Sequence, residues 1–87
     1  MKIVAKPVDM IATFSVQGKP TPYKFRYEDR SGRRIEVRID KIISADSRKL
    51  AGIDSIVYTC QSEIDQILRI FELKYIVGQC RWELYKA

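Results

Sequence analysis

The residues best suited to a chemical role are basic side chains gathered around one predicted hairpin. Three arginines flank its turn, and three further cations alternate along the strands that the turn would join. The six residues are Lys24, Arg26, Arg30, Arg33, Arg34 and Arg38. A planar guanidinium matches a phosphate group, and phosphate contacts dominate non-specific binding to nucleic acids. The cluster therefore suggests a nucleic-acid or anion-binding surface.

Acidic residues interrupt the same hairpin and support a plainer interpretation. Glu28, Asp29, Glu36 and Asp40 are interleaved with the cations, and cross-strand pairs of opposite charge commonly decorate a solvated sheet. The positive excess lies in one half of the chain, because residues 1–49 hold 12 of the 16 Lys and Arg residues but only 6 of the 11 Asp and Glu residues. Such asymmetry favours an anionic partner, so both interpretations stay open.

The aromatic residues of this hairpin weigh against a site that stacks bases. Proteins that bind single strands present aromatic rings beside basic side chains. Here Tyr23, Phe25 and Tyr27 alternate with Lys24 and Arg26, and neighbouring residues of a strand point to opposite faces. We therefore expect the rings in the core and the cations in water.

The same period-two pattern predicts a β-hairpin over residues 23–40. Ile35, Val37 and Ile39 continue the alternation after a tight turn at Asp29–Gly32, whose glycine can adopt a left-handed conformation. Further strands are expected at residues 10–16, with Ala12, Phe14 and Val16 on one face, at 53–60 and at 80–85, while Ile42 and Ile43 extend the hairpin. A turn is expected at 17–22, which contains Pro20 and Pro22, and a polar loop at 45–49.

The segment from Ser62 to Val77 fits two secondary structures. Ser62 could cap a helix. A strand would place Phe71 and Leu73 on one face, with Arg69 as the charged exception to that face. Because β-branched and aromatic residues dominate, we favour the strand.

These elements predict a single all-β domain over residues 1–87. About six antiparallel strands in hairpins would form a highly bent sheet or a small SH3-like or Sm-like barrel, which covers its own edges. The alternative is an α+β fold with a helix over 62–77.

Several classes of function lack the residues that they need. The chain has no histidine, no glycine-rich phosphate loop and only two cysteines, Cys60 and Cys80, so we expect no enzyme activity, no metal site and no cofactor. The cysteines are expected to be free, as in a reducing compartment. Apolar runs are too short for a membrane span or a leader peptide, which makes a cytoplasmic location the expectation.

Several stretches of the chain resemble a family of small uncharacterised bacterial proteins. They are Met10–Ala12, Gly18–Pro20, Lys24–Asp29, Phe71–Tyr75 and Cys80–Tyr85. The resemblance covers most of the chain and implies no activity. The order of elements is also similar to that of Sm-like, SH3-like and WYL-type ligand-sensing barrels, although the Trp-Tyr-Leu signature is absent. This second likeness implies a binding module.

We therefore expect a non-catalytic interaction module that binds a protein partner or a second copy through edge strands or exposed apolar residues. A nucleic-acid-associated protein is the alternative, and a small-ligand sensor or enzyme comes third. Trp82, Tyr58, Tyr75 and Tyr85 could line a pocket but are expected in the core and its rim. Tyr85 lies on the polar side of its strand, so we expect it to be the most exposed of the four. It is therefore a candidate partner contact.

Overall fold

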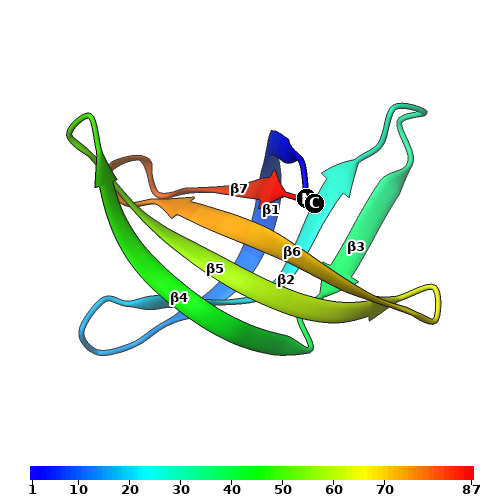
Figure 1. The fold of residues 1–87 in the computed structure, drawn as a ribbon, viewed down its shortest axis with the longest axis horizontal. Helices are drawn as coiled ribbons and strands as arrows, with labels where there is room; N and C mark the ends of the chain where they lie inside the picture. Colours follow the sequence, from blue (N-terminus) through cyan, green and yellow to red (C-terminus); the bar gives the residue numbers. More distant parts are fainter.

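The computed structural model, which describes residues 1–87, shows one antiparallel sheet of seven strands that curls into a half-barrel (Figure 1). The strands are β1 (Ile3–Phe14), β2 (Pro20–Glu28), β3 (Arg34–Arg38), β4 (Lys41–Leu50), β5 (Ile53–Ile64), β6 (Ile67–Ile76) and β7 (Arg81–Lys86). One 3₁₀ turn, η1 (Val77–Gln79), is the only helical segment. The all-β prediction is therefore confirmed.

The strands are arranged in the order β3-β2-β1-β7-β6-β5-β4. Neighbours in the sheet are also consecutive in the chain, except for β1 and β7. The chain ends extend that pairing, because the Lys2 amide donates to the Ala87 carbonyl at 2.9 Å and the Ala87 amide donates to the Lys2 carbonyl at 3.0 Å (Figure 1). The sheet consequently has two edges, β3 and β4, which follow each other in the chain.

A small set of hydrogen bonds, which we call the latch, ties the end of β3 to β5. The hydroxyl of buried Ser62 donates to the Arg38 carbonyl at 2.7 Å and accepts from the Asp40 amide at 3.3 Å. The Asp40 amide also donates to the Gln61 carbonyl at 3.1 Å, and the Asp40 carboxylate accepts from the Glu63 amide at 2.8 Å. These bonds connect distant parts of the sheet across its concave side and hold its curl.

The predicted hairpin at residues 23–40 is confirmed by the antiparallel pairing of β2 with β3. In its turn, one carboxylate oxygen of Asp29 accepts hydrogen bonds from the amides of Ser31 and Arg33, each at 2.9 Å. The Ser31 hydroxyl donates to the same oxygen at 2.7 Å. This hydroxyl and the Arg33 amide hold the pKa of Asp29 below its usual value. The turn is therefore an Asx-type structure built by one side chain.

Tyr23 does not face the core as predicted, since 52 % of its surface is exposed. The register between β1 and β2 shifts between Ile11 and Ala12, whose partners are Lys24 and Pro22. Tyr23 is the residue skipped by this pairing. A β-bulge resets the alternation of a strand, which explains why Tyr23 faces outward although Phe25 faces inward.

The first hairpin lies earlier in the chain than expected. Phe14 ends β1 on the predicted face, where its ring meets the buried Tyr75 edge to face at 6.2 Å, although more than half of its surface is exposed. Val16 is fully exposed in the turn and does not belong to this face. Pro20 and Pro22 are buried within β2 and not in the turn predicted at 17–22. Prolines are tolerated at the first residue of a strand and beside a bulge, where a ladder hydrogen bond is missing anyway.

The predicted loop at residues 45–49 is wrong, because these residues lie inside β4. The strand pairs with β5 in regular register from Ser44 opposite Thr59 to Leu50 opposite Ile53. Nor do Ile42 and Ile43 extend the preceding strand, since β3 ends at Arg38 and both residues belong to the next strand, β4. Nearly every side chain of β4 is exposed, so no hydrophobic alternation marks it.

The segment 62–77 contains no α-helix, and the favoured strand is confirmed for Ile67–Ile76. The prediction missed the turn near the start of this segment. There β5 and β6 form a hairpin around Asp65 and Gln66, whose φ angles are 50° and 65°. Two residues with positive φ are typical of a type I′ turn, which joins strands tightly. The inner face predicted within β6 is confirmed, because Phe71 and Leu73 are buried.

The core lies on the concave side of the sheet. Trp82 packs against Tyr75 and Tyr58 with ring centroids 4.9 Å and 5.5 Å apart, and the Tyr58 hydroxyl donates to the Pro20 carbonyl. Trp82, Tyr58 and Tyr75, which could have lined a pocket, are thus core residues, as expected. Burial raises the pKa of the neighbouring Cys60 thiol to about 12.

Candidate binding surfaces

The structure brings the six predicted cations to one hairpin, which we call the basic face. Lys24 and Arg26 project from β2, Arg34 and Arg38 project from β3, and Arg30 and Arg33 lie in the turn between them. The alternation along β2 and β3 separates these cations from the buried rings, as predicted.

Carboxylates occupy half of the basic face. The ion pairs are Lys24 with Glu36 at 2.9 Å, Arg26 with Asp9 at 3.1 Å, and Arg33 with Asp29 at 3.8 Å. The hydrogen bond and charge of Lys24 hold the pKa of Glu36 below its usual value. Arg30, Arg34 and Arg38 form no ion pair. Only these three arginines are therefore free to meet an anion without displacing a carboxylate.

Tyr85, the predicted partner contact, is half-buried on β7 and is the most exposed of the four aromatic residues considered with it. The Lys74 ammonium lies 4.6 Å from the centroid of its ring, and the Lys86 ammonium lies 5.5 Å from it. Cations above a ring are held there by its negative face. Two lysines thus lie against the Tyr85 ring.

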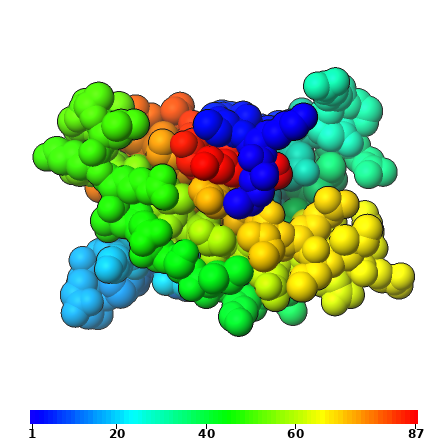
Figure 2. Space-filling model, viewed as in Figure 1, coloured from blue at the N-terminus to red at the C-terminus, as the bar shows by residue number.

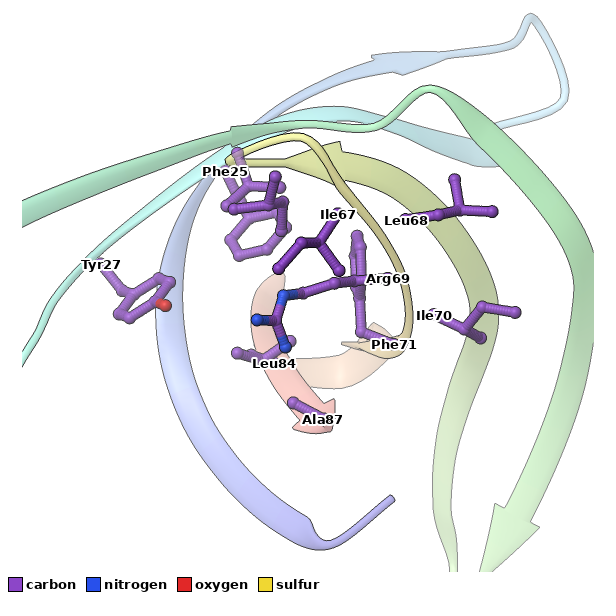
Figure 3. A pocket seen from close by; sticks show the side chains of 11 residues that line it. Phe25, Tyr27, Ile67, Leu68, Arg69, Ile70, Phe71, Leu84 and Ala87 are labelled. Atoms are coloured by element: carbon purple, nitrogen blue, oxygen red, sulfur yellow. The ribbon is translucent and has the colours of Figure 1, made fainter.

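An apolar pocket of about 400 Å³ opens between the β2–β3 hairpin and the β5–β6 hairpin (Figure 3). The two hairpins lie on the same side of the molecule, where Figure 2 shows them in cyan and yellow. The lining residues are Phe25, Tyr27, Val37, Ile64, Ile67, Leu68, Arg69, Ile70, Phe71, Leu84 and Ala87. Buried Phe25 and Phe71 meet edge to face at 5.6 Å, while Ile67 is exposed at the rim.

Arg69 is the one charged residue in this lining. Figure 3 shows its side chain extending from β6 into the pocket, while Leu68 and Ile70 point away. It forms no ion pair, and no other lining side chain is charged. Sequence reasoning missed the pocket, whose walls come from distant strands. Arg69 could have been singled out from the sequence, because it is a charged residue among the apolar residues on one face of its strand.

The free edge of β4 is a second unoccupied surface. The strand is ten residues long and pairs only with β5. None of the backbone hydrogen bonds outside the strand ladders involves residues 41–50. A bulge interrupts the pairing between Ile42 and Ser44, and the rest of the strand is regular. Unpaired groups along such an edge can receive another strand.

No group of three His, Cys, Asp or Glu residues stands close enough to hold a metal ion. Both cysteines are free, Cys60 buried and Cys80 exposed. No helix has the length and apolar character to cross a membrane.

Comparisons with protein families, curated proteins and solved structures found no match. The resemblance to small bacterial proteins and the likeness to small β-barrels therefore stay predictions.

Proposed function

We propose that the protein is a non-catalytic interaction module that joins a second copy of itself through the free edge of β4. The observation that supports this proposal is a long exposed edge strand that also carries self-complementary charges. Strand addition at a sheet edge is a recurrent mode of protein recognition. Two copies would then form one continuous sheet.

The charges of β4 favour one register. In an antiparallel pair related by a two-fold axis through Ser47, Asp46 of each copy lies opposite Arg48 of the other. Opposite charges directly across a pair of strands stabilise it. The two Ser47 residues meet at the axis, and the bulge before Ser44 lies outside the paired segment.

Neighbouring registers bring like charges together. An axis through Asp46 would place the two Asp46 carboxylates opposite each other, and an axis through Arg48 would do the same for the guanidinium groups. Like charges directly opposite destabilise a sheet. The pattern therefore favours the Ser47-centred register over its two nearest competitors.

Sedimentation equilibrium over a range of protein concentrations tests the dimer. We expect self-association by the wild type and at least about 30-fold weaker association for Asp46→Arg, because two ion pairs worth up to about 1 kcal/mol each become repulsive. The double variant Asp46→Arg/Arg48→Asp restores both pairs and should recover dimerisation. Glu63→Arg is the matched control, since it makes the same charge change at an exposed position away from β4.

A wild type that stays monomeric at millimolar concentration contradicts the proposal. So does a dimer that survives Asp46→Arg unchanged, because its interface would then lie elsewhere. Recovery in the charge-reversed double variant would exclude simple unfolding as the cause of the single variant's loss.

Nucleic-acid binding is a second candidate function, favoured by the three unpaired arginines of the basic face. We expect affinity for a nucleic acid to fall steeply with salt concentration and to be lost when Arg30, Arg34 and Arg38 become alanine. Changing the paired Arg26 alone should weaken binding less, because Asp9 already neutralises its guanidinium. Absence of binding at low salt would remove this candidate.

A further inference from the structure

We propose that the apolar pocket binds an amphipathic anion, an unbranched acyl chain whose terminal carboxylate pairs with Arg69. This site is independent of the β4 edge, because β4 contributes no residue to the pocket. It would give the half-barrel a small-molecule ligand in addition to a protein contact.

The size and lining of the pocket fit an apolar chain. Its volume of about 400 Å³ falls within the roughly 300–1,000 Å³ typical of ligand sites. Buried Phe25 and Phe71 form the floor, the aliphatic side chains of Val37 and Ile64 complete the walls, and Ile67 lies at the rim. Walls with so few polar groups offer nothing to a sugar or a nucleotide base, whereas methylene groups gain from leaving water.

The polar groups of the pocket gather where a charged end would lie. Figure 3 shows the Arg69 guanidinium directed toward the side from which Tyr27 projects its hydroxyl group. The Lys6 ammonium lies 5.0 Å from the centroid of the Tyr27 ring. No acidic side chain lines the pocket, and Arg69 has no partner of its own. Arg69 and Tyr27 therefore supply a positive charge and hydrogen-bond donors at this solvent-exposed end of the pocket.

The single guanidinium favours a carboxylate over a phosphate. A planar carboxylate can accept two parallel hydrogen bonds from one arginine. A phosphate monoester carries more charge and a third acceptor oxygen, and Arg69 is the only cation in the lining. One arginine at the end of an apolar pocket therefore matches a monocarboxylate with an acyl chain.

Isothermal titration calorimetry with dodecanoate, below its micelle concentration, tests the assignment. We expect the wild type to bind dodecanoate, and hexanoate more weakly because fewer methylene groups are buried. Arg69→Gln should weaken dodecanoate binding at least about tenfold, through loss of a charged hydrogen-bonded pair. The same variant should leave binding of the neutral alcohol dodecanol unchanged, and Arg69→Lys should retain part of the affinity for dodecanoate.

Arg81→Gln is the matched control, since it removes an exposed arginine from β7 outside the pocket lining. It should bind dodecanoate as the wild type does. The proposal is overturned if the wild type does not bind dodecanoate, or if Arg69→Gln binds it equally well. A short apolar peptide with a free C-terminal carboxylate that binds more tightly than dodecanoate would overturn the acyl-chain assignment.

Discussion

The two edges of the sheet, β3 and β4, follow each other in the chain but have different surroundings. β3 has five residues, buries Val37 and ends in the latch with Ser62. β4 has ten residues, none of them buried, and its outer edge has no hydrogen-bond partner. One edge is therefore used to curl the sheet, and the other is left for contacts outside the chain.

This difference separates stability from recognition along a short stretch of chain. Substitutions in β3 and its latch should lower the free energy of unfolding, because they remove buried side-chain contacts or leave buried polar groups without a hydrogen-bond partner. Substitutions on β4 should leave folding almost unchanged and alter only association. The following predictions test this division, beginning with the largest effect.

Alkaline pH should reveal how well the core around β5, the neighbour of β4 in the sheet, excludes water. The Cys60 thiol, opposite Ile42 of β4, has its pKa raised from 9.0 to about 12 by burial. Above pH 9 the unfolded chain loses this proton and the folded chain keeps it, so stability present below pH 9 is lost as the pH rises toward 12. At about 1.4 kcal/mol per pH unit, the loss approaches about 4 kcal/mol.

Urea denaturation at a series of pH values measures this loss. Burial and the neighbouring Cys60 and Tyr75 also raise the pKa of Tyr58 from 10.0 to about 12, so Cys60→Ala should delay the decline until about pH 10. Cys80→Ala, at an exposed position, should keep the part of the decline that begins near pH 9, because it leaves Cys60 in place. An unchanged pH dependence in Cys60→Ala would mean that the Cys60 thiol is not protected from water in the folded protein.

Matched truncations of the two edges should differ in their effect on stability. Val37→Ala removes buried methyl groups from β3 and should cost about 2 kcal/mol of unfolding free energy. Ile43→Ala, on exposed β4, should cost less than about 0.5 kcal/mol. Chemical denaturation of both variants gives the comparison, and equal losses would contradict the proposed division between the edges.

The sequence revealed the strands that have one buried face and one solvated face. Residues 23–40 were predicted because Phe25 and Val37 alternate with charged residues, which is what a half-buried strand requires. Residues 45–49 were missed because β4 is exposed on both faces, so nothing in its side chains distinguishes it from a loop. The turn at Asp65–Gln66 was missed because it lacks the glycine that usually marks a type I′ turn.

The candidate sites depended on contacts that no local pattern contains. The cations of the basic face were found from their spacing, but Asp9, which neutralises Arg26, comes from β1 and a distant part of the sequence. The pocket combines residues of β2, β3, β5, β6 and β7. Arg69 was visible as a charged residue on an apolar face, yet its meaning required the curl of the sheet.

Removing one hydroxyl group from the latch and one from the β4 edge tests the latch more directly. Ser62→Ala leaves the Arg38 carbonyl without its partner in a buried site and should cost about 1.5 kcal/mol. Ser47→Ala, on exposed β4, should change stability by less than about 0.5 kcal/mol. Hydrogen exchange should also become faster in β3 of Ser62→Ala. A variant as stable as Ser47→Ala would show that the latch does not hold the curl.

The smallest effect should come from stabilising the turn that joins β4 to β5. Ala51 and Gly52 join β4 to β5 with φ angles of 51° and 79°, and asparagine adopts such a left-handed conformation more readily than alanine. Ala51→Asn should therefore stabilise the protein by about 0.5–1 kcal/mol, which raises Tm by roughly 2–8 °C in a domain of this size. Ala45→Asn, within β4, places the same residue where the backbone is extended and should give no gain in stability.

Slower amide exchange along β4 in Ala51→Asn alone would show that the β4 edge is held by its ladder with β5 and by this turn. Equal behaviour of the two variants would mean that the turn does not limit the stability of β4.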